Sequence, residues 1–166
     1  MNKFFSRVFV AVFCLVVVSG CQKKVGSEFH GQMAPDFTVP LLEEEKGTVT
    51  LSQLYHEKVV LLNFWATWCP VCVEEIPAIN QLAKEYPDLE ILAVNIQESR
   101  EEIKSFTKRM PMQFPVALDL EGKVAEQYGL IGLPVSIVIS KGGRIIYYGF
   151  SLPSNMKQLI NEGAKI

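Results

Sequence analysis

The sequence predicts an α/β fold in which a mixed central sheet carries helices on both faces. Two continuous apolar runs, 58–66 and 89–96, are typical of strands that are buried on both sides of a sheet. A segment with helical spacing, 70–86, lies between them. Two further runs, 134–140 and 144–150, are separated by Lys-Gly-Gly, which predicts an antiparallel hairpin. Strands that alternate with helices and end in a hairpin indicate a mixed sheet.

Four shorter elements complete the expected order. Ser99 and Glu102 form a capping box that predicts the start of a helix. A short strand at 114–118 and a short helix at 122–128 precede the hairpin, and a last helix, capped by Ser154, closes the chain. The chain has 166 residues, 49% of them hydrophobic, which is enough for one compact domain with a real core.

Residues 1–20 have the three parts of a secretory signal, namely Lys3 and Arg7, the apolar run 8–18, and small residues before Cys21. The apolar run is well short of the roughly 20 residues that a helix needs to span a bilayer, so a permanent transmembrane helix is the weaker interpretation.

Loss of the signal changes the formal charge of the chain from −2 to −4. This acidic balance gives no indication of a basic surface for nucleic acid.

The signal ends in Val18-Ser19-Gly20-Cys21, which is similar to a bacterial lipobox. Cys21 would then be the first residue of the mature protein and carry the lipid. The alternative is ordinary cleavage nearby with Cys21 as a stray thiol, but a lone cysteine is a liability in a secreted chain. Two or three acyl chains hold a protein stably at a membrane. We therefore expect an extracytoplasmic, lipid-anchored protein with a lipidated N-terminus and tether at 21–33 and a domain at 34–166.

Cys69 and Cys72 are the cysteines left to the domain, because we expect Cys14 to be lost with the signal and Cys21 to be acylated. They stand where a buried strand passes into a helix, and Pro70 suits the first helical turn. Free N–H groups and the helix dipole stabilise a thiolate at a helix N-terminus, which predicts Cys69 as the attacking nucleophile. Cys72, one turn further on, is the resolving thiol. This redox-active disulfide needs no cofactor.

Two structural alternatives exist for this cysteine pair. A bridge that closes so short a loop gains little loop-closure entropy, which disfavours a purely structural disulfide. A zinc site needs two further ligands, and the two histidines, His30 and His56, lie upstream and 26 residues apart. We therefore predict no metal site.

With the strand, the cysteine motif and the helix in place, the sequence resembles the thioredoxin superfamily. Within it, the sequence is most similar to the membrane-anchored TlpA/ResA-like branch, which includes the CcmG-type cytochrome c maturation proteins. The resemblance extends from about residue 34 to the C-terminus. It is carried by Ala34-Pro35-Asp36-Phe37, Leu51-Ser52-Gln53-Leu54, the run 59–72, Pro77 and Gly132-Leu133-Pro134. It implies a thioredoxin fold with an N-terminal extension and a central βα-type insertion at about 98–118.

The resemblance also implies a substrate-binding surface formed by Trp68, Pro70, Leu133 and Pro134. The Leu133–Pro134 bond is expected to be cis, which would turn the Leu133 backbone toward the cysteines to pair with an extended substrate segment. A trans turn proline is the alternative. Asn63 stands where plain thioredoxins keep a buried aspartate, although asparagine is usual in this branch.

Glu75 falls on the apolar face of the helix together with Cys72 and Ile76, whereas Glu74 falls outside that face. Partial burial would raise the pKa of the Glu75 carboxyl and suit it to accept the Cys72 proton during resolution. A glutamate at this offset is regarded as functional in the TlpA/ResA-like proteins. The alternative is a half-exposed glutamate that pairs with a lysine.

The leading hypothesis is a thiol-disulfide oxidoreductase that reduces cysteines of exported proteins. The resemblance implies apocytochrome c as a substrate and a membrane thiol transporter of the CcdA or DsbD type as the electron donor. A disulfide oxidase or isomerase would use the same chemistry. A metal-site assembly chaperone of this fold uses a histidine downstream of the cysteine pair, and none follows Cys72. A peroxidase is disfavoured because Ala66-Thr67-Trp68 lacks the proline and threonine pattern of the peroxiredoxins.

Overall fold

The computed structural model describes residues 28–165. The signal at 1–20, Cys21 and the first part of the tether lie outside the described residues. The elements are β1 (Thr38–Pro40), the 3-10 helix η1 (Glu44–Lys46), β2 (Thr48–Thr50), α1 (Leu51–Tyr55), β3 (Val59–Trp65), α2 (Pro70–Glu85), β4 (Leu89–Ile96), α3 (Arg100–Arg109), β5 (Val116–Asp119), α4 (Lys123–Gln127), β6 (Val135–Ile139), β7 (Ile145–Gly149) and α5 (Met156–Gly163).

The main sheet has five strands in the order β5-β4-β3-β6-β7. β3 lies in the centre, where it runs parallel to β4 and antiparallel to β6, so the sheet is mixed as predicted. All seven residues of β3 are buried, which explains its continuous apolar sequence. The loop that leaves the end of this central strand leads directly into α2 and its cysteines.

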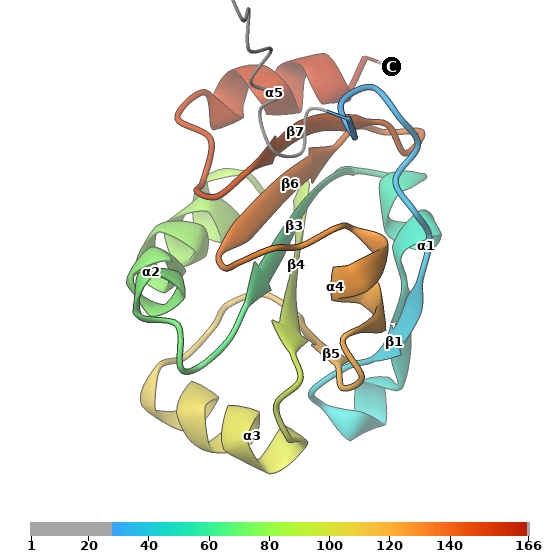
Figure 1. Cartoon of the computed structure of the whole chain (residues 1–166). Coiled ribbons are helices and arrows are strands. Elements are labelled where there is room, and N and C mark those ends of the chain that lie inside the picture. The colour runs from blue at the N-terminus through green and yellow to red at the C-terminus, as the bar shows by residue number, and fades with distance from the viewer. Residues whose placement is uncertain (1–27, 166) are drawn as a thin grey trace, which may run out of the picture.

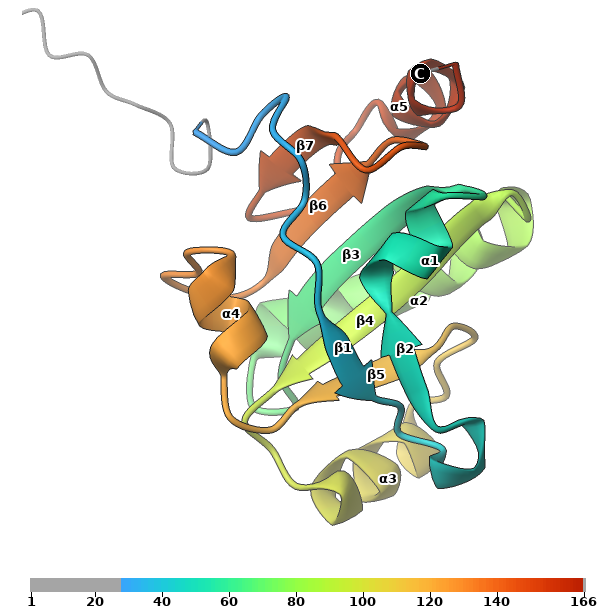
Figure 2. The same ribbon diagram turned by 90° about the vertical axis from the view of Figure 1, so that its right-hand side faces the viewer.

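Helices cover both faces of the sheet. The core on one face includes residues of α2, α3 and α5, and the core on the other includes residues of α1, α4 and the β1–β2 pair. Figure 1 shows α2 and α1 on opposite sides of the strands, and Figure 2 shows β1, β2, α1 and α4 together on the face toward the viewer. Because strand side chains alternate, Leu61 and Trp65 of β3 face the α2 side, while Leu62 and Phe64 face the other side.

α3 and β5 form the insertion that is expected at about 98–118. β5 pairs in parallel with β4 and forms one edge of the sheet. The predicted capping box is present at the start of α3, where the Ser99 hydroxyl accepts from the Glu102 N–H and the Glu102 carboxylate accepts from the Ser99 N–H at 2.9 Å. The predicted cap of α5 is wrong, because Asn155 rather than Ser154 is its N-cap and no side-chain cap hydrogen bond forms.

The N-terminal extension contains more structure than the sequence predicts. β1 and β2 pair antiparallel, and α1 follows directly. Some residues expected in the tether also pack on the domain: the Phe29 ring stacks on Tyr148 with centroids 5.4 Å apart, and the Gly31 N–H donates to the Ile145 carbonyl at 2.7 Å. The packed part of the chain therefore begins before residue 34. Within residues 28–165, none of the helices has both the length and the apolar composition that crossing a bilayer requires.

Candidate active site

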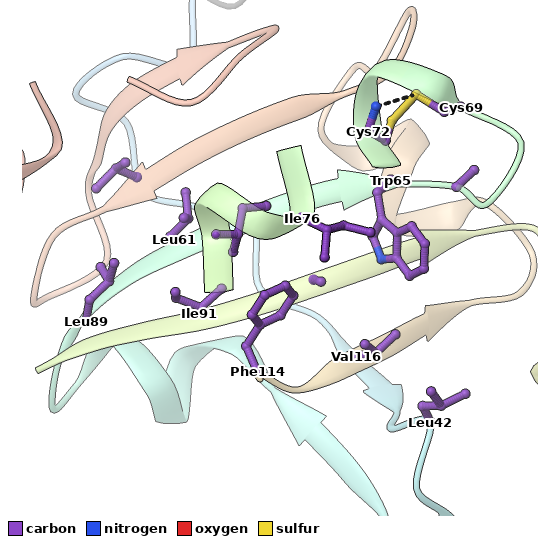
Figure 3. Close-up of a cluster of buried hydrophobic side chains, with 14 of the residues drawn as sticks. Leu42, Leu61, Trp65, Cys69, Cys72, Ile76, Leu89, Ile91, Phe114 and Val116 are labelled. Atoms are coloured by element: carbon purple, nitrogen blue, oxygen red, sulfur yellow. Dashed lines mark hydrogen bonds between the residues drawn. A yellow bond between two sulfur atoms is a disulfide. The ribbon is translucent and has the colours of Figure 1, made fainter. Parts of the chain in front are cut away.

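Cys69 and Cys72 form a disulfide where α2 begins (Figure 3). Cys69 is the N-cap residue of the helix, and its Sγ accepts a hydrogen bond from the Cys72 backbone N–H at 3.2 Å. This contact satisfies one of the N–H groups that a first helical turn leaves free. In the reduced protein, the same N–H and the positive end of the helix dipole favour a thiolate on Cys69. The local geometry therefore supports Cys69 as the nucleophile.

The disulfide is buried next to exposed apolar side chains. Cys69 is 5% exposed and Cys72 is 2% exposed, whereas Trp68 and Val71 are 67% and 53% exposed. Pro70 occupies the first helical position, where its missing N–H leaves no helical hydrogen bond unmade. Trp68 and Val71 are thus open to solvent beside the disulfide, and Cys69 is the slightly more exposed of the two cysteines.

Two buried side chains of β3, Trp65 and Asn63, face the α2 side of the sheet. Trp65 is 1% exposed, and Figure 3 shows its indole beside Ile76 of α2. Asn63 donates from Nδ2 to the Ser136 hydroxyl at 3.1 Å across the β3–β6 pair. The position at which plain thioredoxins keep a buried aspartate thus holds a neutral amide that has a partner within the sheet.

Leu133 and Pro134 lead into β6 beside the end of β3. Val135 is paired with Phe64, so the register places Pro134 next to the end of β3, from which the chain continues to Cys69. Leu133 packs against the core cluster that includes both cysteines, and the Leu133–Pro134 peptide bond is cis. Ile131, just upstream, is 76% exposed.

Glu75 lies one turn beyond Cys72, and its side chain is partly buried. Its Oε1 accepts a hydrogen bond from the Leu152 N–H at 3.3 Å, and its Oε2 is buried without a partner. Burial raises the pKa of the Glu75 carboxyl, and the Leu152 hydrogen bond acts in the opposite direction. None of the salt bridges among residues 28–165 includes Glu75, so the lysine-paired alternative finds no support there.

A second carboxylate, that of Glu98, lies beside the loop that precedes the cysteines. The sequence did not lead us to predict it. Glu98 accepts hydrogen bonds from the Thr67 N–H at 2.7 Å, from the Thr67 hydroxyl, and from Asn95 Nδ2 at 2.7 Å. These contacts tie the loop that precedes Cys69 to the end of β4.

One signal could have found Glu98. β3 and β4 are parallel, so the residues that follow them meet at the same edge of the sheet. Thr67 follows the first of the two buried apolar runs and Glu98 follows the second. Polar side chains directly after two neighbouring parallel strands therefore predict a contact near the site.

The remaining site predictions concern a metal and the lipid. Within the part of the chain that the structure describes, no group of three or more His, Cys, Asp or Glu side chains lies where it could hold a metal ion. Cys21, the predicted lipid site, lies outside the described residues.

Comparison with known sequences places this site among similar proteins. A model of the AhpC/TSA family matches residues 30–148. The thiol-disulfide oxidoreductase ResA of Bacillus thuringiensis subsp. konkukian is 40% identical over 118 residues, which cover 70% of this chain and 66% of that relative. The chain thus spans slightly less than two thirds of the length of this relative.

Two solved structures are similar over most of their length. A DsbE-type thiol:disulfide interchange protein of Chlorobium tepidum is 30% identical with a TM-score of 0.73, and the match covers 81% of this chain and 96% of that one. The exposed lipoprotein thioredoxin Etrx1 of Streptococcus pneumoniae is 28% identical with a TM-score of 0.67, and the match covers 77% of this chain and 99% of that one.

Proposed function

The chain belongs to the AhpC/TSA family and is a homologue of ResA-type thiol-disulfide oxidoreductases, and we propose that it reduces disulfides of exported proteins at a membrane surface. Its thioredoxin-like fold, which the resemblance implies, is confirmed by the mixed five-stranded sheet and by the likeness to the DsbE-type structure. The reductase direction, the substrates, the electron donor and the lipid anchor are the content of the proposal.

One observation carries the proposed chemistry, namely the place of Cys69 at the N-cap of α2. Its sulfur accepts a hydrogen bond from the Cys72 N–H. Cys72 lies one helical turn further on and forms the disulfide with Cys69. A nucleophilic thiol at a helix N-terminus with a second thiol one turn further on is the arrangement that dithiol-disulfide exchange requires.

The reaction proceeds in two exchange steps. In the reduced enzyme, the Cys69 thiolate attacks one sulfur of a substrate disulfide, and the other sulfur leaves as a thiolate that takes up a proton. Cys72 then loses its proton and attacks the Cys69 sulfur, which releases the second substrate thiol. Two electrons pass to the substrate, and the enzyme ends as the Cys69–Cys72 disulfide.

Glu75 is placed to accept the Cys72 proton in the second step. It lies one turn along the same helix, and burial brings its pKa closer to neutral pH. The unpartnered Oε2 leaves one carboxylate oxygen free to take the proton. Asn63 cannot perform this task, because an amide does not titrate.

The surroundings of the cysteines favour a reducing couple. The two residues between them, Pro70 and Val71, supply no cation that would hold a thiolate. Ionised Glu75 adds negative charge near the thiols, which raises their pKa and destabilises the reduced form. Strong oxidants of this fold reach about −120 mV because their reduced form is stabilised, whereas thioredoxin is at about −270 mV.

The proposed location and partners follow from the sequence. The signal at 1–20 and the lipobox-like residues before Cys21 support a lipid-anchored protein outside the cytoplasm. Etrx1, a similar structure, is itself a lipoprotein. The resemblance to CcmG-type proteins supports apocytochrome c as substrate and a CcdA- or DsbD-type transporter as the source of electrons.

The redox potential tests the direction. Equilibration of the protein with glutathione and dithiothreitol buffers should place the Cys69–Cys72 couple closer to about −270 mV than to about −120 mV. A potential above about −150 mV would contradict the reductase and favour the oxidase or isomerase.

A trapping experiment tests the substrate. The Cys72→Ala variant should retain a mixed disulfide on Cys69, because no second thiol resolves it. When this variant is expressed in its native host, it should capture proteins with a Cys-x-x-Cys-His haem-attachment motif at the membrane. Mass spectrometry identifies the captured proteins. The Cys69→Ala variant is the matched control and should capture far less. Equal capture of cysteine pairs without the histidine would contradict a preference for apocytochrome c.

A further inference from the structure

One peptide group links Tyr147 to Glu75. The Tyr147 hydroxyl donates a hydrogen bond to the Ser151 carbonyl at 2.8 Å. The Leu152 N–H donates to Glu75 Oε1 at 3.3 Å. The Ser151 carbonyl and the Leu152 N–H belong to the same peptide group, so the two hydrogen bonds act in series. A donor on the carbonyl side both orients such a group and polarises its N–H toward the acceptor.

We propose that Tyr147 is a positioning residue for Glu75. Its hydroxyl holds the 151–152 peptide group in the orientation in which the N–H reaches the carboxylate, and it thereby controls how readily Glu75 takes up a proton. The catalytic meaning of this control rests on the proposed function, but the hydrogen-bonded connection does not.

Gly149 provides an independent observation. A methyl group at Gly149 would meet the Tyr147 hydroxyl and lie 2.8 Å from the Tyr147 Cζ, closer than real Cβ contacts come. The Gly149 backbone lies outside the left-handed region, so its conformation does not require glycine. The absent side chain instead leaves the space in which the Tyr147 ring folds back over Gly149 to reach Ser151.

The groups around Glu75 leave the Leu152 N–H as the contact that offsets its burial. Burial raises its pKa, the Leu152 hydrogen bond lowers it, and no charged side chain contributes. On its own helix, Glu74 is exposed, while the two cysteines are joined as a disulfide and do not titrate. From the β7–α5 side, Tyr147 faces Glu75 through the peptide group.

The sign of the expected effect follows from the donor. An N–H that points at a carboxylate stabilises the ionised form. If the Tyr147 hydroxyl is removed, the 151–152 peptide group is held less firmly, and its N–H stabilises the carboxylate less. Glu75 then keeps its proton to a higher pH.

The test measures the titration of Glu75 directly, in the full-length oxidised protein. The side-chain carboxyl carbons of 13C-labelled glutamates are followed by NMR, and Glu75→Gln identifies the Glu75 signal. In Tyr147→Phe the midpoint should rise by about half a pH unit, because charge-assisted hydrogen bonds of this kind are worth about one pH unit or more when lost completely. Gly149→Ala displaces the Tyr147 ring and should move the midpoint in the same direction.

Tyr148→Phe is the matched control. Tyr148 is the next residue on β7, and its hydroxyl also donates to a backbone carbonyl, that of Tyr128, at 3.0 Å. Its side chain packs on the opposite face of the sheet from Tyr147. This variant loses an equivalent hydrogen bond on the other face of the sheet, and the Glu75 midpoint should stay at its wild-type value.

Three outcomes would overturn the proposal: an unchanged midpoint in Tyr147→Phe, an equal shift in Tyr148→Phe, or a downward shift. If Tyr147→Phe does not fold, as judged by circular dichroism, Gly149→Ala decides the question. A separate readout concerns the proposed function: the pH profile of thiol exchange should move with the Glu75 midpoint. If the midpoint moves and the exchange profile does not, Tyr147 still positions Glu75, and it is the proton-carrier role of Glu75 that fails.

Discussion

Glu98 holds Thr67 by both of that residue's donors, the backbone N–H at 2.7 Å and the side-chain hydroxyl. Thr67 is two residues before Cys69, so this contact fixes the loop that carries the nucleophile to the N-terminus of α2. Glu98 is itself held by Asn95 Nδ2 at 2.7 Å. The position of Cys69 therefore depends on the end of the neighbouring strand β4 as well as on its own helix.

We expect Glu98→Ala to destabilise the oxidised protein by about 1.5–3 kcal/mol, because the partly buried Thr67 N–H and Asn95 amide lose a charged acceptor. Urea denaturation measures the change. Glu126→Ala, which alters an exposed glutamate of α4, is the control and should change stability by less than about 0.5 kcal/mol. Equal effects of the two variants would show that the Glu98 contacts contribute nothing specific.

Reduced protein should be alkylated first at Cys69. Its sulfur accepts the Cys72 N–H at the start of the helix, which favours its thiolate, and it is the less buried of the two. Brief iodoacetamide treatment at mild pH, followed by peptide mass spectrometry, measures the order of labelling. Faster labelling of Cys72 would reverse the roles of the two cysteines.

Glu75→Gln should change how stability depends on pH. Burial raises the pKa of Glu75 above its usual value of 4.5, so the folded protein binds this proton more tightly than the unfolded chain does. The wild type therefore loses stability as the pH rises from below 4.5 through the raised pKa, whereas the variant has no such loss. In urea denaturation, the free energy of unfolding of wild type minus that of the variant should fall as the pH rises from 4.5 through the raised pKa of Glu75. The exposed neighbour Glu74→Gln should show no such trend, and a flat difference for Glu75→Gln would contradict burial of the carboxyl.

The same variant should alter the redox chemistry. Without the ionised Glu75 carboxylate, the thiol pKa values should fall and the potential should become less negative. Exchange should also slow, because Cys72 loses its proton acceptor. Redox-buffer equilibration and stopped-flow reduction of a disulfide peptide measure the two effects. A more negative potential in the variant would show that the charge of Glu75 does not act on the thiols.

Cys21→Ser should release the domain from the membrane into the soluble extracytoplasmic fraction, because the serine hydroxyl cannot take the thioether-linked lipid. Fractionation with a salt wash and immunoblotting measures the distribution. Retention of the variant in the washed membrane pellet would place the anchor elsewhere in the chain.

The sequence by itself determined the elements that form the main sheet and the cysteine pair at the start of α2. The continuous apolar runs of β3 and β4, the capping box of α3 and the cysteine pair at the start of α2 can each be recognised locally. Helical periodicity alone placed Glu75 on the inner face of α2. These features act over one strand or one helical turn, so the information lies in neighbouring residues.

Only the tertiary structure decided which distant groups meet at the site. Glu98 reaches Thr67 across 31 residues, and Leu152 reaches Glu75 across 77, because the sheet order and the loop after β7 bring them together. The strands β1 and β2 have three residues each, which is too short for an alternating hydrophobic pattern to be recognised in the sequence. Their pairing and burial stabilise them, and both depend on the tertiary structure. The hydrogen bond from the Tyr147 hydroxyl to the Ser151 carbonyl likewise cannot be predicted from the sequence. A tyrosine on an edge strand has many possible partners, and the tertiary structure determines which of them it contacts.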